Sequence, residues 1–315
     1  MAVSQAISKT PEMDLDREMT QLQLIWMRFR KHKLAMVGLV VLSLLILAAV
    51  LAPVISPYDP EYIDRTIQGP ASALGYDKPS LLHFFGTDDL NRDVFTRLLY
   101  ASRISLLIGF AAMICAIIIG TLVGSLAGFY GGWVDSVLMR IVDLMLTLPY
   151  IPLLLILSAM LRQYRIEGLQ PEQTQIITIV LALVVLGWMG TARIVRSAIL
   201  SVRSQDYVEA ARALGSRDAR IIIRHLLPNA LPPIIVQATL SVGQYIISES
   251  AISFLGVGIN PPTASWGNML TNFQTYMLVE PLMAIYPGAA IFLTVLSINF
   301  IGDGLQAAMD PRMTK

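Results

Sequence analysis

The sequence contains little cysteine, little histidine and little charge. Its single cysteine, Cys115, lies in an apolar run, so the chain can form neither a disulfide framework nor a thiolate metal site by itself. The three histidines, His32, His83 and His225, lie far apart on different segments, and neither a His-Glu-x-x-His motif nor a nucleophile elbow occurs. We therefore expect no metal site and no intramembrane enzyme.

Two further absences argue against nucleotide chemistry and nucleic-acid binding. No Gly-Lys dipeptide occurs, so the chain has no P-loop and should not hydrolyse a nucleotide itself; we expect no cofactor in this chain. The net charge is only +1, and no basic face lies outside the flanks of the apolar segments. A nucleic-acid partner is therefore not expected.

What the sequence does contain is apolar residues. They make up 55% of the chain, whereas charged residues make up 14%, well below the roughly 25% of soluble domains. The mean hydropathy of +0.63 agrees with this composition. The polar N-terminus, MAVSQAISKTPEMDLDRE, lacks the basic and apolar regions of a cleavable signal peptide. The composition indicates an integral membrane protein surrounded by lipid.

Six apolar segments are long enough to cross a bilayer, which predicts an all-α, polytopic membrane protein with six transmembrane helices. The third contains Pro149 and Pro152, which predict a kink, and Pro232 and Pro233 suit the start of the fifth. The predicted spans are residues 34–52, 102–128, 134–160, 174–192, 232–255 and 281–301.

The basic residues predict the orientation of these spans. Fifteen Lys and Arg residues lie in the termini and in the loops on their side, and six lie in the opposite loops. The positive-inside rule then places both termini in the cytoplasm. The predicted organisation is a cytoplasmic segment 1–33, a first transmembrane helix 34–55, an extracytoplasmic loop 56–101, a five-helix transmembrane domain 102–304 with a cytoplasmic loop 203–228, and a cytoplasmic tail 305–315.

Small residues recur at four-residue spacing in the second span. They are Ala116, Gly120, Gly124 and Gly128. A stripe of small residues lets two helices approach closely in lipid, although membrane helices also tolerate glycine without such a contact. The regular register favours helix packing.

Residues 206–228 form a long polar island between apolar segments. Asp206 is expected to be the N-cap of a short helix, with Glu209 completing a capping box, and Gly215 is expected to supply the left-handed residue after its end. The helix would cover residues 207–214, only about two turns, which is marginal without something to pack on.

The faces of this short helix suggest two roles. Tyr207, Ala211 and Leu214 form an apolar stripe, and Ala210 keeps the middle of the helix thin. The helix could cover its own protein, or it could bind a partner in the cytosol. The predicted cytoplasmic placement favours the second role.

The fifth span is the most polar. Gln237, Ser241, Gln244 and Ser248 follow one face, with Glu249 at its border. These side chains could line a solute pathway or form hydrogen bonds between helices. Glu249 could also relay protons in a self-contained, ion-coupled carrier.

An ion-coupled carrier could use a second acidic residue as well. Asp143 in the third span could serve the same purpose, or it could pair with Arg140 three residues earlier. Ion-coupled carriers often consist of two repeated halves, and no convincing internal repeat occurs here. A transporter subunit driven by a separate cytosolic motor is therefore the better supported class, because only in this class would the polar island have a binding partner in the cytosol.

The polar island resembles the EAA signature of ABC importer permeases, which reads EAA, three residues, Gly, nine residues, Ile, one residue and Leu-Pro. His225 stands where the signature has Ile. The matching residues are Glu209, Ala210, Ala211, Gly215, Leu227 and Pro228.

Four other segments resemble the C-type permease subunit of dipeptide and oligopeptide importers. They are FGTDDLNRDVFTRL, in which Asn91 replaces a usual glycine, GFYGGWVDSVLMRIVDLMLTLP, LGVGINPPTASWGNML and INFIGDGLQAAMDP. The resemblance implies a type I ABC importer permease fold in the cytoplasmic (inner) membrane of a bacterium or archaeon. It implies import of di- or oligopeptides, although similar permeases serve nickel, glutathione and oligosaccharides.

The resemblance also implies partners. They are a homologous B-type permease in a heterodimer, two cytosolic ATPase subunits that bind ATP and Mg²⁺, and an extracytoplasmic binding protein. Residues 207–214 would be the coupling helix that docks on one ATPase, with Glu209, Ala210, Ala211 and Gly215 shaping that contact.

Overall fold

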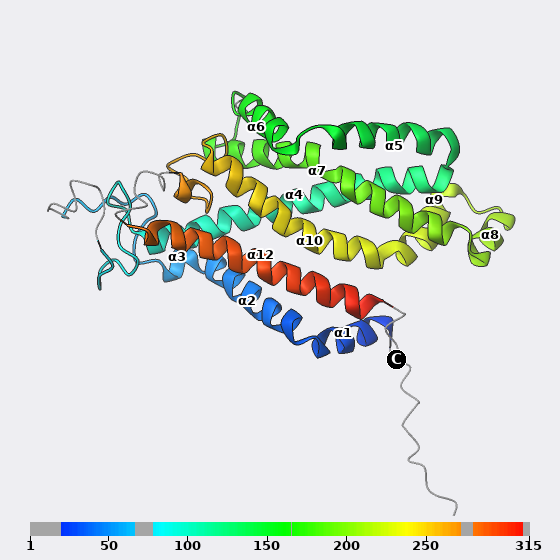
Figure 1. Ribbon diagram of the computed structural model, residues 1–315, viewed down its shortest axis with the longest axis horizontal. Helices are drawn as coiled ribbons and strands as arrows, with labels where there is room; N and C mark the ends of the chain where they lie inside the picture. The colour runs from blue at the N-terminus through cyan, green and yellow to red at the C-terminus, as the bar shows by residue number, and fades with distance from the viewer. Residues whose placement is uncertain (1–19, 67–77, 165, 272–279, 311–315) are drawn as a thin grey trace, which may run out of the picture.

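Long helices lie side by side and form the molecule (Figure 1). The computed structural model describes residues 20–66, 78–164, 166–271 and 280–310, and these contain two isolated β-bridges but no strand. The first nineteen residues of the predicted N-terminal segment and the last five of the predicted tail lie outside the described residues. So do Lys9, Arg17, Arg165, Arg312 and Lys315, which contributed to the predicted orientation.

Most of the described helices follow one another closely, and longer connections come after Ile55 and after Phe254. They are α1 (Gln21–Lys31), α2 (Lys33–Val50), α3 (Ala52–Ile55), α4 (Val94–Tyr130), α5 (Gly132–Thr147), α6 (Tyr150–Leu161), α7 (Pro171–Arg203), α8 (Asp206–Ala213), α9 (Asp218–Ile221), α10 (Leu227–Phe254) and α12 (Leu282–Met309), with a π-helical turn η2 (Ile222–Leu226) and a 3-10 turn η3 (Asn268–Leu270).

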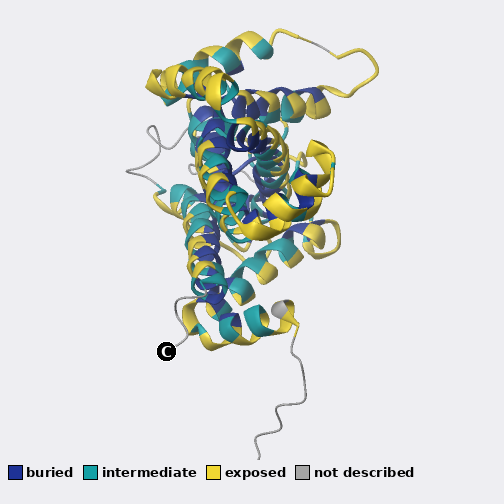
Figure 2. Ribbon diagram, turned by 90° about the vertical axis from the view of Figure 1, so that its right-hand side faces the viewer, coloured by how far each residue is buried: buried dark blue, intermediate teal, exposed yellow. Residues whose placement is uncertain are grey.

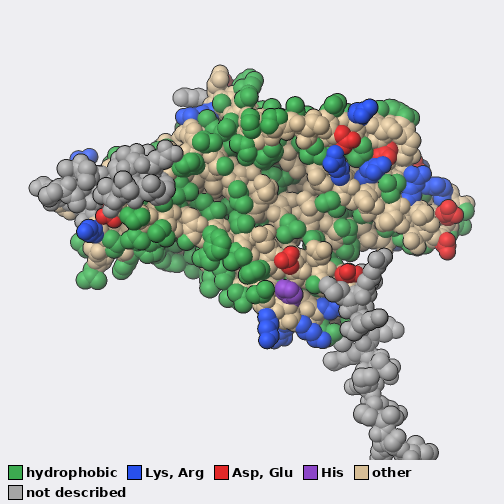
Figure 3. All heavy atoms as spheres, in the orientation of Figure 1, with side chains coloured by type: hydrophobic (Ala, Val, Ile, Leu, Met, Phe, Trp, Pro, Cys, Tyr) green, Lys and Arg blue, Asp and Glu red, His purple; other side chains and the backbone are tan. Residues whose placement is uncertain are grey.

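The all-α fold predicted from the sequence is confirmed, and so is its membrane character. Five helical segments are long and apolar enough to cross a membrane, and the bent pair α5 and α6 makes six if it crosses once. Hydrophobic side chains cover much of the middle of the surface, while charged side chains gather toward its ends (Figure 3). This distribution suits a bundle whose middle is surrounded by lipid.

Helix α4 extends beyond the span predicted for it. It begins at Val94 rather than near residue 102, because the Asp93 carboxylate accepts a 2.7 Å hydrogen bond from the backbone N–H of Thr96 and caps the helix there. Its 37 residues reach roughly 55 Å at 1.5 Å per residue, well beyond the hydrocarbon core of a bilayer. Part of α4 must therefore lie outside the hydrocarbon.

The predicted kink of the third span is present and amounts to a break. Helices α5 and α6 meet at 92°, with Leu148 in an extended conformation before Pro149. A residue that precedes proline is disfavoured in the α region, so α5 ends there. Pro152 causes no second break, because it lies in the first turn of α6, where a missing N–H costs little.

The prediction that Pro232 and Pro233 start the fifth span was wrong. Helix α10 begins five residues earlier, at Leu227, and both prolines lie inside it. The π-helical turn η2 leads directly into this helix, and the side-chain amide of Asn229 donates a 2.6 Å hydrogen bond to the carbonyl of His225. The chain therefore stays helical from Asp218 to Phe254.

Helices α4 and α7 pack closely along the stripe of small residues. A Cβ added at Gly124 would lie 2.5 Å from the carbonyl oxygen of Ala192, and one at Gly120 would lie 2.6 Å from Cβ of Thr191. Gly128 faces Ile199 in the same way, and Ala116 is buried. Figure 2 shows such buried positions, in dark blue, in the interior of the bundle.

Candidate functional site

Helix α8 lies at one end of the bundle, just after α7 (Figure 1). The predicted capping box is absent. Gln205 is the N-cap, in an extended conformation, and its carbonyl accepts hydrogen bonds from the backbone of Val208 and Glu209. Asp206 is instead the first helical residue, and neither its side chain nor that of Gln205 caps the helix. Asp206 and Glu209 still favour the helix, because negative charge in the first turn suits its dipole.

The end of α8 is built as the sequence predicted. Gly215 has a φ of +78°, in the left-handed region. Its N–H donates to the carbonyl of Arg212 at 2.9 Å, and the N–H of Ser216 donates to the carbonyl of Ala211 at 3.1 Å. These two bonds form a Schellman motif, which ends the helix firmly.

The two faces of α8 differ from the predicted apolar stripe. Val208 and Ala211 are buried, and Val208 packs into a cluster that includes Phe129 and Ile199. Tyr207 and Leu214 are 42% and 87% exposed. Ala211 therefore shares its inward face with Val208, three residues earlier, and not with the other members of the predicted stripe.

The remaining signature residues lie around this helix. Glu209 and Ala210 are exposed beside Tyr207. Leu227 and the exposed Pro228 open α10, while His225 is half-buried in the π-helical turn η2. Turns of this type recur at functional sites. Helix α8 therefore has an exposed side, formed by Tyr207, Glu209, Ala210 and Leu214, and a buried side, formed by Val208 and Ala211.

Ion pairs tie α7 to α5 toward the same end. Arg196 binds the carboxylate of Asp135, with one contact of 2.5 Å from Nη2, and Arg193 Nη2 lies 2.5 Å from Asp143 Oδ1. Of the roles considered for Asp143, pairing with Arg140 is therefore not what the structure shows. The partner lies on a neighbouring helix, fifty residues away in sequence.

The polar residues of the fifth span do not share one environment. Ser241, Ser248 and Glu249 are buried, whereas Gln244 is exposed. Gln237 is half-buried and donates to the hydroxyl of Ser241 at 3.2 Å. The four residues share one side of α10 by helical spacing, but neighbouring segments bury that side unevenly along its length.

Glu249 is the centre of a buried polar cluster. It has no exposed surface, and it accepts hydrogen bonds from the hydroxyls of Ser253 at 2.8 Å and Ser105 at 3.0 Å. Trp266, also fully buried, donates its backbone N–H to Ser105 and its indole N–H to Ser102, both at 3.1 Å. The cluster joins α4, α10 and the connection after α10. Sequence analysis singled out Glu249 but missed Ser105 and Trp266, which only tertiary contact brings to it.

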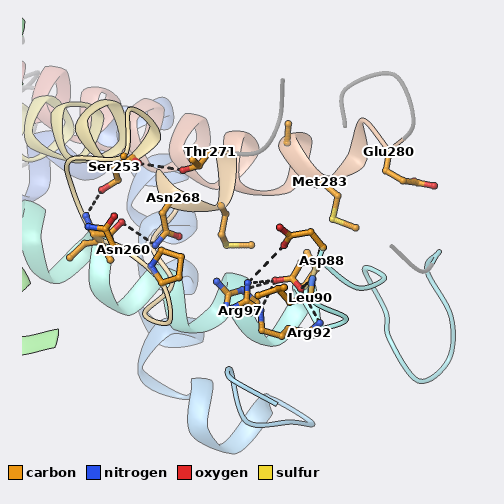
Figure 4. Close-up of a pocket in the computed structure, with 17 residues that line it drawn as sticks. Asp88, Leu90, Arg92, Arg97, Ser253, Asn260, Asn268, Thr271, Glu280 and Met283 are labelled. Atoms are coloured by element: carbon orange, nitrogen blue, oxygen red, sulfur yellow. Dashed lines mark hydrogen bonds and ion pairs between the residues drawn. The ribbon is translucent and has the colours of Figure 1, made fainter. Parts of the chain in front are cut away.

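A cavity of about 190 Å³ lies near this cluster (Figure 4), at the opposite end of the bundle from α8 (Figure 1). Arg92 and Arg97 contact Asp88 on its wall, with Nη2–Oδ2 and Nε–Oδ2 distances of 2.7 and 3.3 Å. Asn91, on the adjoining turn, has a φ of +58°, a conformation that asparagine tolerates in place of glycine. The wall is held by internal ion pairs.

The loop before α4 is pinned by a histidine. The His83 ring lies between Asp93, 2.9 Å from Nδ1, and Asp64, 3.4 Å from Nε2. Thr66 donates hydrogen bonds to the Asp64 carboxylate from its hydroxyl and backbone, at 2.6 and 2.8 Å. These bonds, with a smaller contribution from His83, hold the pKa of Asp64 below its usual value.

Among the described residues, no group of three His, Cys, Asp or Glu side chains could hold a metal ion.

Comparison with known proteins identifies the family. Residues 120–315 match the family described as "Binding-protein-dependent transport system inner membrane component", and residues 20–74 match the "N-terminal TM domain of oligopeptide transport permease C".

Individual proteins agree with these matches. The chain is 40% identical to the dipeptide transport system permease protein DppC of Alkalihalophilus pseudofirmus, over 91% of this chain and 88% of that protein. It is 38% identical to the glutathione transport system permease protein GsiD of Escherichia coli, over 98% and 96%. A chain from an inward-facing structure of the MetNI methionine ABC transporter has the same fold, with a TM-score of 0.53 at 22% identity over 69% of this chain and 98% of that one. This chain belongs to the family of binding-protein-dependent transport system inner membrane components and has the fold of an ABC transporter permease.

Proposed function

We propose that this chain forms one half of the translocation pathway of an ATP-driven importer of di- or oligopeptides. The solute would be delivered by an extracytoplasmic binding protein, and the other half of the pathway would be a homologous permease. The likeness to a dipeptide permease along most of the chain supports this substrate class. The chain itself would be a transport subunit, and ATP with Mg²⁺ would bind to separate ATPase subunits.

The observation that carries this proposal is the exposed surface of α8. Leu214 is 87% exposed at the end of a helix whose opposite side is buried, and Tyr207, Glu209 and Ala210 are exposed beside it. A large apolar side chain presented in this way on a firmly ended helix suits insertion into a pocket of another protein. We assign α8 as the coupling helix that docks on one ATPase.

The base of α8 would transmit movement into the membrane. Val208 packs with Phe129 at the end of α4, Ile199 in α7 and Ile221 before α10, so a displaced α8 would carry the ends of three helices with it. ATP binding would close the ATPases and move the spans from an inward-open to an outward-open state. Changing such an equilibrium from 1:99 to 99:1 takes roughly 5.5 kcal/mol of differential binding.

This assignment also sets the orientation that we propose. The α8 end of the bundle, and both termini with it, would face the cytoplasm of a bacterial or archaeal cell. The many arginines between residues 203 and 224 support this placement.

Uptake into proteoliposomes tests the proposal. The chain alone would be compared with the chain assembled with its permease, ATPase and binding-protein partners, with and without ATP. We expect uptake of a labelled dipeptide only by the full assembly with ATP. Uptake by the chain alone, driven by a pH gradient, would instead assign it to the ion-coupled carriers and direct attention to Glu249.

Glutathione is the second candidate substrate, because a glutathione permease resembles this chain over nearly its whole length. Competition distinguishes the two candidates. Excess unlabelled glutathione should leave dipeptide uptake unchanged if the assembly is a dipeptide importer. Glutathione uptake that dipeptides do not inhibit would assign the assembly to glutathione.

A further inference from the structure

Helix α1 is a separate, well-ended helix that precedes the first span. Thr20 and Gln23 form a capping box at its start, with hydrogen bonds of 3.0 and 3.4 Å between side chains and backbone. At its end, His32 is the C-cap of α1 and also the N-cap of α2, where its Nδ1 accepts from the N–H of Ala35 at 3.1 Å. A single non-helical residue therefore joins α1 to the membrane span.

One face of α1 is fastened to the bundle. Phe29 is buried and packs in a cluster with Ala35, Ile301 and Ala308, so α1 lies against the last part of α12 (Figure 1). Gly304 leaves room for this contact, since a Cβ added there would lie 3.1 Å from the Phe29 ring. The helix is thus held in a fixed place beside α12.

The side chains of α1 that remain exposed are of two kinds, and the Trp26 ring stacks beside that of Phe29 with 5.9 Å between the ring centroids. Leu22 and Trp26 are 79% and 53% exposed, and Met27 is 38% exposed. Basic residues follow: Arg30, Lys31 and Lys33 are exposed, and Arg28 is half-buried. No Asp or Glu occurs between residues 20 and 33, and within the described residues no carboxylate forms an ion pair with these four bases. Figure 3 shows Lys and Arg side chains gathered over α1 and the start of α2.

We propose that the exposed surface of α1 binds the headgroups of anionic phospholipids. Because α2 crosses the membrane and only His32 separates it from α1, α1 must lie at the membrane surface. Leu22 and Trp26 would enter the boundary between headgroups and acyl chains, and the basic side chains would contact lipid phosphates and other anionic headgroup atoms.

The continuity of the exposed surface favours lipid over a protein partner. Along α2, the apolar side chains of Leu34, Val37, Val40 and Leu44 are all more than half exposed, as expected for a helix surrounded by acyl chains. The basic residues lie where this apolar surface begins. Helix α8, which we assign to the ATPase, lies elsewhere, at the outer end of the bundle (Figure 1).

Fluorescence quenching by brominated lipids tests the proposal directly. The full chain would be reconstituted in phosphatidylcholine nanodiscs that contain increasing fractions of brominated phosphatidylglycerol or brominated phosphatidylcholine. The chain has four tryptophans, so the Trp26 signal is obtained by subtracting the spectrum of Trp26→Phe. One engaged basic side chain raises the local concentration of an anionic lipid roughly fivefold. We expect half-maximal quenching at about a fifth or less of the mole fraction that the neutral lipid requires.

Two variants control for charge and position. The triple variant Arg30→Gln, Lys31→Gln and Lys33→Gln should quench equally with both lipids, while the matched variant Arg217→Gln, Arg220→Gln and Arg224→Gln should keep the preference. Equal quenching of the unmodified chain by both lipids would overturn the proposal, as would an undiminished preference in the first variant. Loss of co-purified ATPase subunits by the first variant, with its lipid preference kept, would assign the patch to a protein interface. The measurement uses neither ATP nor solute, so its outcome is independent of the proposed transport.

Discussion

The Ser105 hydroxyl in α4 donates a 3.0 Å hydrogen bond to the Glu249 carboxylate in α10, and both side chains are fully buried. The same hydroxyl accepts the backbone N–H of Trp266. The Glu249 carboxylate thereby joins two spans to the connection that follows α10. Glu249 is therefore a structural centre of the end of the bundle opposite α8.

The first prediction concerns Glu249. Glu249→Ala should destabilise the protein by about 1–3 kcal/mol for each buried hydroxyl left without an acceptor, whereas Glu249→Gln should be much milder because an amide oxygen still accepts. Thermal unfolding of the purified chain in detergent measures the difference. Equal unfolding temperatures for the two variants would show that the hydrogen bonds to this residue do not hold the cluster together.

A second prediction concerns the end of α8. Gly215→Pro fixes φ near −65° where the chain has +78°, and it removes the hydrogen bond to Arg212. ATP hydrolysis by the assembled transporter should continue while uptake falls, because α8 no longer keeps its shape. Uptake and phosphate release would be measured on the same proteoliposomes.

The matched control is Gly190→Ala, because nothing lies within 4 Å of a Cβ added in α7 at that position. It should leave both activities unchanged. Uptake that stays coupled to hydrolysis in Gly215→Pro would remove α8 from the coupling path.

Close packing of α4 and α7 gives a third prediction. Gly124→Ala places a methyl group 2.5 Å from the Ala192 carbonyl, so the helices must separate, at a cost of about 1–3 kcal/mol. Gly288→Ala in α12 meets nothing within 4 Å and should not destabilise the chain. If both variants unfolded at the same temperature as the unmodified protein, the contact between α4 and α7 would be looser than described.

The fourth prediction is a pH dependence. Because the pKa of Asp64 is lower in the folded protein than its usual value of 3.8, its stabilising contribution is present above about pH 4 and is lost as the pH falls through the folded pKa. Thr66→Val removes one of the two hydrogen bonds that Thr66 donates, and raises that pKa. The variant should unfold at a lower temperature than the unmodified protein at pH 6, and this difference should shrink as the pH falls below about 4. A difference that does not depend on pH would mean that Thr66 acts only through packing.

Local signals in the sequence predicted much of the fold. Apolar length identified the spans, Pro149 identified the break in the third, and Gly215 identified the end of α8, because each depends on the chemistry of a few adjacent residues. The positions of Pro232 and Pro233 show where such signals fail. The helix continues from η2 into α10 without a break. The carbonyl groups that the two prolines leave without a helical hydrogen bond therefore do not end it.

The candidate site was less predictable, because tertiary contacts decide it. Helical spacing alone grouped Tyr207 with Ala211, but the packing against Phe129 selects Val208 as the buried residue. Asp143 has Arg140 nearby in sequence, yet α7 brings Arg193 closer. Neither choice can be made before the arrangement of the helices is known.

The glycine contacts give α4 and α7 a mechanical property. The glycines of α4 contact α7 at successive helical turns. Contacts this close resist sliding and separate bending, so we expect the two helices to move together as one rigid unit. A push at its α8 end would reach Trp266, at the far end, as rotation of the whole unit with little loss to internal flexing. Movement at one face of the membrane would in this way reach the buried cluster near the other face.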